Sequence, residues 1–207
     1  MRTDYGYFAN YGFIRTTIPQ ELSEQLRQEI DQIPHTSTTI DNKLAGNIQR
    51  QYLLSKHGAR LRDFVCVQCQ RYSEHWPKQH TRQDLGTDNL ELQDYWCNIQ
   101  YKHEFNPMHD HWGTWSFVTW LSVPYYIQQE LAEPQCVYSR TPRAGMFSFV
   151  YTNIFGEVCE AEFYVDKTWE NEMLIFPSKL QHMVYPFYTS DEPRISVSGN
   201  LINRPRQ

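Results

Sequence analysis

Long apolar segments are missing from the sequence. The longest mostly apolar run, residues 116–127, is interrupted by Thr119, Ser122 and Pro124. It falls well short of the roughly 20 residues that a membrane-spanning helix needs, so we expect no transmembrane helix. The first residues, MRTDYGYFANYGF, lack the basic start, apolar stretch and small-residue cleavage site of a secretory signal. We therefore expect a protein that is not secreted.

Excess positive charge is also missing. The chain has 19 Lys and Arg residues against 24 Asp and Glu residues, which gives a net charge of -5 at pH 7. Neither half carries a stripe of basic residues, so the sequence offers no electrostatic footprint for a phosphate backbone. We expect neither a nucleic acid nor a membrane among the partners of this protein.

Cysteine is scarce and its pattern is not that of a disulfide framework. The chain has five Cys, an odd number, and no Asn-x-Ser/Thr glycosylation site, which indicates a reducing compartment such as the cytoplasm. Cys66 and Cys69 form one C-x-x-C pair, but no second pair follows as in a zinc ribbon. Apolar residues recur around them at helical spacing, so we expect both thiols to pack within a helix.

Aromatic and apolar side chains are plentiful, and they predict one soluble domain. Hydrophobic residues make up 40% of the 207 residues, and 6 Trp, 14 Tyr and 11 Phe are present, enough for a single core. The first 90 residues have helical character. A helix is predicted between Pro19 and Pro34, where Leu22, Leu26 and Ile30 recur every four residues. Further helices are predicted over 47–54 and 59–73, followed by a polar connector over 75–89.

Short segments rich in β-branched and aromatic residues begin near Glu91. They predict strands near 92–102, 116–123, 146–153, 157–165, 173–176, 182–187 and 194–200. Asn153 and Gly156 lie between two of these segments and predict a tight hairpin, because Gly readily supplies the positive φ that such a turn needs. Seven strands after a helical layer predict a mainly β member of the α+β class, a two-sheet sandwich or jelly roll. We divide its single domain, 1–207, into a helical support, 1–90, and a jelly-roll catalytic core, 91–203.

Three histidines and one arginine stand out in the second half. In an extended segment, residues i and i+2 face the same side, so His109 and His111 can direct two imidazoles at one metal ion. His182 lies in the apolar segment EMLIFPSKLQHMVYPF, and Arg194 begins another strand, with Ser196 two residues later. Alone, the H-x-H pair is also compatible with surface histidines, and His182 with a core residue. Together with Arg194, which typically pairs with an anion, they indicate a metal site beside an anion site.

The same residues carry a resemblance to a known family. The sequence resembles the non-haem Fe(II), 2-oxoglutarate-dependent oxygenases, most closely the branch found in tailed phages and marine bacteria. That branch has W-x-N, H-x-H, S-x-x-Y-Y, F-P-S-x-L-x-H and R-I-S-x-x-x-N, and this chain has Thr119 and Trp120 in place of the two Tyr of the third motif. The matching residues here are Trp96, Asn98, His109, His111, Ser116, Phe176, Pro177, Ser178, Leu180, His182, Arg194, Ile195, Ser196 and Asn200.

The resemblance implies a double-stranded β-helix that uses Fe(II), 2-oxoglutarate and O2. It implies oxidative decarboxylation of 2-oxoglutarate to succinate and hydroxylation of a substrate, for which prolyl-hydroxylase-like relatives indicate an amino-acid side chain in a protein or peptide. If the chain is phage-encoded, it would act in the host cytoplasm.

Residue by residue, the resemblance assigns iron binding and catalysis to one set and cosubstrate binding to another. The catalytic and metal-binding residues it implies are His109, His111 and His182. Arg194 would bind the distal carboxylate of 2-oxoglutarate with help from the Ser196 hydroxyl, and Asn98 and Tyr101 would complete the cosubstrate pocket.

Several alternatives stay open at the level of sequence. His111 occupies the position that most of the superfamily gives to Asp or Glu, so Asp110 is a second candidate ligand. His111-Trp112-Gly113 can also be read as the H-x-G of related halogenases. A three-His, cupin-type dioxygenase without 2-oxoglutarate, and a non-catalytic phage sandwich with a stabilising metal, are further candidates. Trp112, Trp115 and Trp120 either line the substrate pocket or fill the core.

Overall fold

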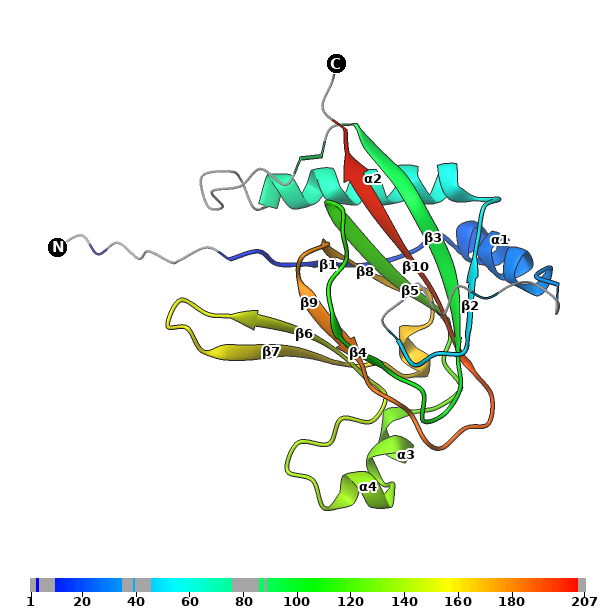
Figure 1. Ribbon diagram of the computed structural model, residues 1–207, viewed down its shortest axis with the longest axis vertical. Coiled ribbons are helices and arrows are strands. Elements are labelled where there is room, and N and C mark those ends of the chain that lie inside the picture. Colours follow the sequence, from blue (N-terminus) through cyan, green and yellow to red (C-terminus); the bar gives the residue numbers. More distant parts are fainter. Residues whose placement is uncertain are drawn as a thin grey trace.

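A computed structural model describes residues 10–34, 46–75 and 89–204, together with residues 3, 39, 86 and 87. Within them, two antiparallel sheets face each other, and two helices cover the outer face of the larger sheet (Figure 1). The larger sheet has the strand order β1 (Ile14–Thr17), β8 (Glu172–Pro177), β5 (Trp115–Ser122), β10 (Arg194–Asn203), β3 (Leu90–Gln100) and β2 (Arg50–Leu53). The smaller sheet has the order β4 (Asn106–His109), β9 (Gln181–Val184), β6 (Met146–Thr152) and β7 (Val158–Tyr164). This arrangement confirms the predicted jelly-roll sandwich.

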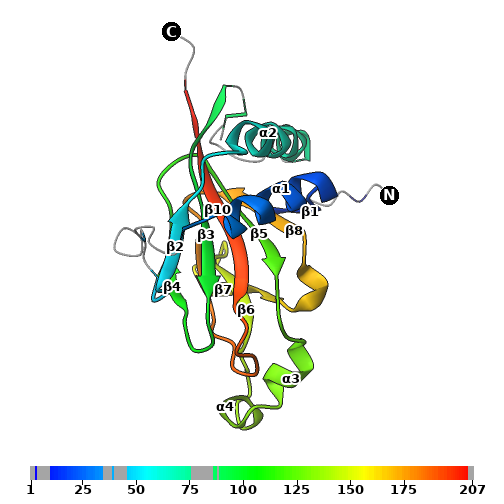
Figure 2. The ribbon, with the colours of Figure 1, turned by 90° about the vertical axis from the view of Figure 1, so that its right-hand side faces the viewer.

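The helical layer packs on the sheet through one apolar face of each helix. In α1 (Gln20–Asp31), Leu22, Leu26 and Ile30 are buried as their spacing predicts. In α2 (Gly58–His75), Cys69 is fully buried and Cys66 is half-buried against the same core, which confirms the two helix-packing thiols. Figure 2 shows both helices on one side of the larger sheet. No helix in the described part of the chain is long and apolar enough to span a membrane.

Alternation along the central strands divides the core into two layers. On β5, Trp115, Phe117 and Leu121 face the helices, whereas Val118 and Trp120 face the smaller sheet. Because side chains in a strand point to opposite faces in turn, one apolar strand supplies both layers. The inner layer between the sheets is mainly aromatic, and Phe147, Phe149 and Phe176 form its centre.

The seven predicted strands correspond to β3, β5, β6, β7, β8, β9 and β10. The predicted hairpin joins β6 to β7, with Gly156 at a φ of 80°. Short helices α3 (Ile127–Leu131) and α4 (Pro134–Val137) follow β5, and a 3-10 turn, η2 (Lys167–Trp169), precedes β8. The polar connector predicted over 75–89 lies mostly outside the described residues.

The helix predicted over 47–54 is wrong. Residues 50–53 form β2, which pairs antiparallel with β3, Gln51 opposite Asn98 and Leu53 opposite Trp96. Gln51 is buried there, and its Nε2 donates a hydrogen bond of 2.6 Å to Asn98 Oδ1. The weak helical preference of these eight residues is outweighed by pairing with the long strand β3, because that pairing satisfies the hydrogen-bonding groups of their backbone. Strands β1 and β2 therefore place part of the first 90 residues in the larger sheet.

Candidate active site

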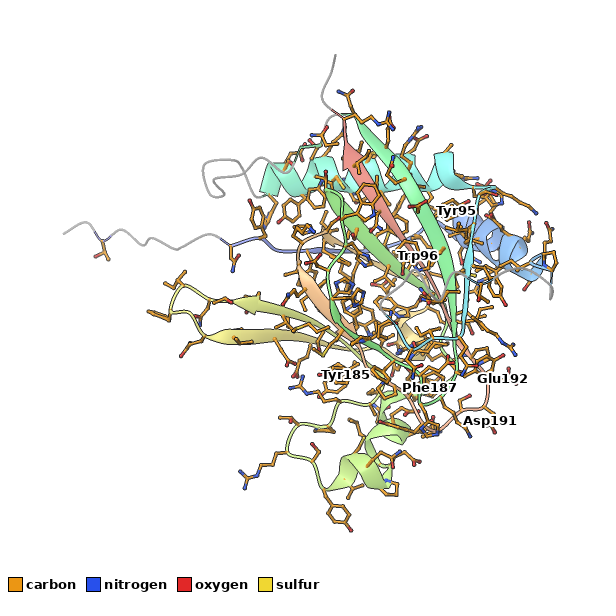
Figure 3. All side chains as sticks on the ribbon, in the orientation of Figure 1. Tyr95, Trp96, Tyr185, Phe187, Asp191 and Glu192 are labelled. Atoms are coloured by element: carbon orange, nitrogen blue, oxygen red, sulfur yellow. The ribbon has the colours of Figure 1, made fainter. Side chains whose placement is uncertain are left out.

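A cavity of about 450 Å³ lies between the two sheets. Alternate residues of β3 and β10 line its floor, since every second side chain of a strand faces the same side. These residues are Asp94, Trp96, Asn98 and Gln100 on β3 and Arg194, Ser196, Ser198 and Asn200 on β10. Figure 3 shows Trp96 near the middle of the molecule, whereas Tyr185 and Phe187, beside Arg194, lie towards α3 and α4. The cavity is of the size that binds small molecules.

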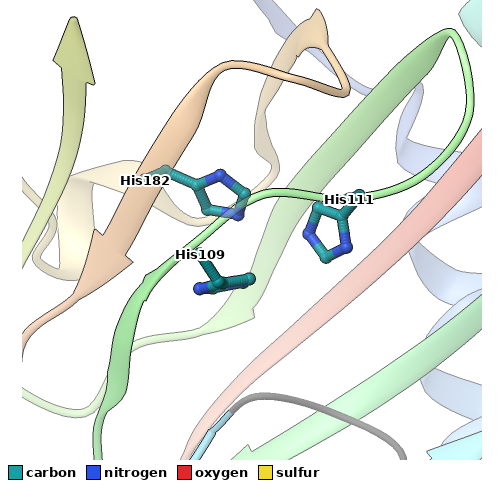
Figure 4. Close-up of side chains that lie close together, drawn as sticks. All are labelled: His109, His111 and His182. Atoms are coloured by element: carbon teal, nitrogen blue, oxygen red, sulfur yellow. The ribbon is translucent and has the colours of Figure 1, made fainter.

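Three histidines face this floor from the side of the smaller sheet. His109 ends β4 and lies opposite His182 on β9, and His111 follows two residues after β4. One ligating nitrogen of each ring lies within 4.8 Å of those of the other two. The ring centroids of His109 and His182 are 4.3 Å apart, and that of His111 is 5.1 and 5.0 Å from them (Figure 4). The structure thus brings together the three histidines singled out in the sequence.

Two of the rings are held in the tautomer that a metal ion needs. His109 Nδ1 lies 2.7 Å from the carbonyl oxygen of Pro107, and His182 Nδ1 lies 3.0 Å from that of Leu180. A carbonyl oxygen only accepts, so each Nδ1 carries the hydrogen and donates it. The Nε2 lone pair of each ring is then free to bind a metal ion.

Burial keeps all three imidazoles neutral. It lowers the pKa of His109, lowers the pKa of His111 to about 4 and places the pKa of His182 well below its usual range. The neighbouring imidazoles add to this effect at His111 and His182, because a second positive charge is unfavourable so close by. Neutral imidazole is the form that binds metal ions.

A buried hydrogen-bond network fixes the backbone that carries His111. The His111 N–H donates to the Ser178 carbonyl oxygen at 2.9 Å, and the Ser178 N–H donates to the Thr114 carbonyl oxygen at 3.1 Å. The Ser116 hydroxyl links Ser178 Oγ at 2.9 Å to Asn200 Oδ1 at 2.8 Å. Ser116, Ser178 and Asn200 are motif residues of the resemblance. Here they join β5 and β10 to the turn after β8, and of the three only Asn200 is among the described residues that line the cavity.

Arg194 is a buried cation that has no charged partner among the described residues. It is only 2% exposed, and its five N–H groups donate to four neutral groups: Gln100 Oε1, Tyr125 Oη and the carbonyl oxygens of Gly145 and Tyr185. No carboxylate among the described residues lies within ion-pair distance of it. A buried charge is costly unless it is paired, so the site favours an anion.

The remaining predicted residues divide between the cavity and its surroundings. Asn98 and Ser196 line the cavity, and Asn98 Nδ2 donates to Ser196 Oγ at 3.2 Å. Tyr101 does not line it, although it was predicted to. Because Asn98 and Gln100 face the floor, the alternation directs Tyr101 elsewhere, where its hydroxyl accepts a hydrogen bond of 2.9 Å from Arg50.

The Asp110 carboxylate and the three tryptophans also take distinct positions. Asp110 pairs with Lys179 Nζ at 3.1 Å and is not one of the three clustered ligands. Trp112 is 58% exposed at the edge of the cavity. Trp115 is buried on the helical side, where its Nε1 donates to Gly86, and Trp120 lines the cavity while packing on Phe147. Trp112 and Trp120 therefore line the cavity, and Trp115 fills the core; that the cavity takes the substrate stays a prediction.

The donor set fits a divalent transition metal. Three neutral imidazole nitrogens on one side of the cavity suit Fe(II), and they leave the opposite side open to other ligands. The residues that would hold the metal are His109, His111 and His182. Arg194, which lines the same cavity, offers a positive charge to an anionic ligand.

Comparison with protein families identifies this chain. A family model described as "Putative 2OG-Fe(II) oxygenase", where 2OG is 2-oxoglutarate, matches residues 94–200, just over half of the 207 residues. The chain belongs to the 2OG-Fe(II) oxygenase family. The resemblance seen in the motifs is thereby confirmed, and the oxygenase uses Fe(II), 2-oxoglutarate and O2. The phage and marine bacterial branch stays a prediction.

Solved structures share the fold of this oxygenase at low sequence identity. A 2OG-Fe(II) oxygenase family oxidoreductase from Burkholderia pseudomallei is 12% identical, with a TM-score of 0.52, and covers 99% of this chain and 94% of its own. A Trichoplax adhaerens prolyl hydroxylase, solved with a hypoxia inducible factor oxygen degradation domain peptide fragment, is 11% identical, with a TM-score of 0.52 and coverages of 93% and 84%. HygX from Streptomyces hygroscopicus with iron bound is 11% identical, with a TM-score of 0.52 and coverages of 93% and 82%. No curated protein matches the chain.

Sequence reasoning missed two partners of Arg194 in this oxygenase. Gln100 was available from the alternation that places Asn98 on the floor, because it lies two residues further along β3. Tyr125 had no local signal. It follows β5, stacks on Phe187 with ring centroids 4.9 Å apart, and reaches Arg194 only through the packing of distant segments.

The lowered histidine pKa values predict an acid-sensitive metal-free oxygenase. At about pH 7.5 and above, these histidines are mostly neutral in both folded and unfolded chains, because the ordinary pKa of histidine is about 6.5. As the pH falls towards about 4, the unfolded chain binds protons that the folded His111 does not, so the unfolded state gains stability. We expect the Tm of the chelator-treated protein to fall between about pH 7.5 and about pH 5, and to fall less in His111→Asn. Equal decreases in both proteins would contradict this.

Proposed function

We propose that this protein is a dioxygenase that couples oxidative decarboxylation of 2-oxoglutarate to hydroxylation of a substrate, an amino-acid side chain in a protein or peptide. One observation carries the proposal: three neutral imidazoles and a buried, uncompensated guanidinium line the same cavity. A stabilising metal alone would not require Arg194. The general fold of the Trichoplax prolyl hydroxylase, solved with a peptide, supports the choice of substrate class.

Each residue has one task in this proposal. His109, His111 and His182 hold Fe(II), which when bound supplies the chemistry that consumes O2 and converts 2-oxoglutarate to succinate and CO2. Arg194 binds the distal carboxylate of the cosubstrate. Ser196 lies two residues after Arg194 on β10, so both side chains face the cavity. Its hydroxyl donates a hydrogen bond to the same carboxylate.

The floor and rim contribute positioning. Asn98 holds Ser196 and Ser198 through its Nδ2 and accepts the Trp96 indole N–H at its Oδ1. These bonds keep the polar floor rigid, which is needed because small displacements of bound groups slow oxidation. Trp112, exposed at the edge, is placed to contact a substrate as it enters.

An anaerobic titration tests the proposal. Fe(II) and 2-oxoglutarate together should give the protein a weak metal-to-ligand charge-transfer band, which neither gives alone. Once O2 is admitted with a peptide library, succinate and products heavier by one oxygen atom should form together. Absence of the band would contradict the proposal. Consumption of O2 without succinate would instead favour a three-His dioxygenase that needs no cosubstrate.

A further inference from the structure

Arg194 has two kinds of hydrogen-bond partner, and only one of them faces the cavity. Two of the partners are the carbonyl oxygens of Gly145 and Tyr185. The backbone of both residues is fixed by further hydrogen bonds, because the Gly145 N–H donates to Pro186 O and the Tyr185 N–H donates to Met146 O, both at 2.8 Å. Tyr125 is 2% exposed. Gln100 and Arg194 line the cavity, whereas Tyr125, Gly145 and Tyr185 are not among the described residues that line it.

Gln100 occupies the edge of the guanidinium that binds carboxylates. Its single Oε1 accepts from Arg194 Nη2 at 2.8 Å and from Nε at 3.2 Å. Nε and one Nη form a fork that matches the two oxygens of a carboxylate. One neutral amide oxygen of Gln100 therefore occupies the position at Arg194 that the two charged oxygens of a carboxylate would take.

A carboxylate has a clear energetic advantage over the amide at this edge. Charge-assisted hydrogen bonds are roughly twice as strong as neutral ones, and a buried guanidinium without a counter-ion gains most from an anion. The Gln100 amide can turn its Oε1 away from Arg194 by pivoting about the hydrogen bond that its Nε2 donates to the Glu104 carbonyl oxygen at 2.6 Å. The other acceptors stay in place and hold Arg194 in position.

We propose that Gln100 is a placeholder that occupies the distal-carboxylate subsite of the free protein and is displaced when a cosubstrate carboxylate binds. This inference rests on the proposed function, because it takes 2-oxoglutarate as the ligand of Arg194. The inference adds Gln100 as a residue that sets the affinity for 2-oxoglutarate, because its side chain competes with the cosubstrate for Arg194. The competition is intramolecular, so its strength depends on the charge that residue 100 presents to Arg194.

Two substitutions separate this role from ordinary packing. Gln100→Glu places a carboxylate of nearly the same shape on the same atoms and should lower the affinity for 2-oxoglutarate by at least about tenfold, through internal competition. Gln100→Leu removes the competitor, and its affinity for 2-oxoglutarate should be equal to or higher than that of the unaltered protein. The dissociation constants are measured by calorimetry on the Mn(II)-loaded protein under nitrogen.

A matched control is available on the helical layer. Gln68 on α2 is also buried and also accepts a hydrogen bond from an arginine, Arg71 Nη1, at 3.2 Å. Gln68→Glu makes the same chemical change away from the cavity and should leave the affinity unchanged. A second readout needs neither metal nor cosubstrate: Gln100→Glu should raise the Tm of the metal-free protein, since Arg194 gains a charged partner.

The outcomes divide cleanly. Weaker binding in Gln100→Glu, without weaker binding in Gln100→Leu, supports the placeholder. Unchanged affinity in Gln100→Glu overturns it, and so does a loss in Gln100→Leu beyond that of Gln68→Glu, because Gln100 would then be a direct ligand of the cosubstrate. If the unaltered protein binds no 2-oxoglutarate, the proposed function fails. If it binds and the variants do not follow this order, only the placeholder fails.

Discussion

Replacing Arg194 with alanine is expected to weaken the binding of 2-oxoglutarate by at least about 30-fold. Truncating one partner of a buried, hydrogen-bonded charge pair costs about 2 to 5 kcal/mol, and each 1.4 kcal/mol is a factor of ten in affinity. Arg194 is 2% exposed, and no described carboxylate pairs with it, so the cosubstrate would be its first charged partner. The change is measured by calorimetry and by loss of the charge-transfer band.

Arg194→Lys is the matched control for that experiment. Lysine keeps the positive charge but lacks the planar fork that binds two oxygens at once. It also cannot fill all five hydrogen bonds that Arg194 makes to Gln100, Tyr125, Gly145 and Tyr185. Its affinity for 2-oxoglutarate should therefore lie between those of the unaltered protein and Arg194→Ala. An Arg194→Ala protein that binds 2-oxoglutarate normally would show that another group holds the carboxylate.

Removal of His182 is expected to abolish metal binding and turnover together. Loss of an outer-shell partner alone commonly costs 10- to 100-fold in metal affinity, so loss of a ligand should cost more than about 100-fold. His182 is the most deeply buried of the three clustered histidines, at 4% exposed, and packs against Phe176 and Phe147 with ring centroids 4.9 and 5.6 Å away. His182→Ala should therefore not bind Fe(II). It should also give no charge-transfer band with Fe(II) and 2-oxoglutarate, because that band requires the bound metal.

A histidine outside the cluster controls for that change. His103 is exposed and has a φ of 70°, a conformation that asparagine tolerates, so His103→Asn should leave metal affinity unchanged. Metal content of both variants is measured after dialysis against Fe(II) under nitrogen, and Tm reports whether each is folded. A folded His182→Ala protein that retains stoichiometric Fe(II) would remove His182 from the metal site.

Local patterns were sufficient where one signal dominates. The four-residue spacing of Leu22, Leu26 and Ile30 predicted α1, and the apolar and aromatic segments after Glu91 predicted the seven later strands. The segment 47–54 lacked such a signal, and its neighbours decided the outcome: pairing with β3 made it a strand and buried Gln51. Short segments with weak preference are decided by tertiary contacts, which no local pattern reports.

The sequence by itself determined which residue types could form a metal site and an anion site. The residue types and spacings of His109, His111, His182 and Arg194 indicated a metal site and an anion site, because i and i+2 in an extended segment face one side whatever the rest of the fold does. Only the tertiary structure decided how these groups are surrounded. Pairing of β4 with β9 brings His109 opposite His182, and packing of separate segments delivers Gln100, Tyr125 and two backbone carbonyls to Arg194. Contacts between residues far apart in the chain depend on strand register and sheet packing, which are properties of the whole fold.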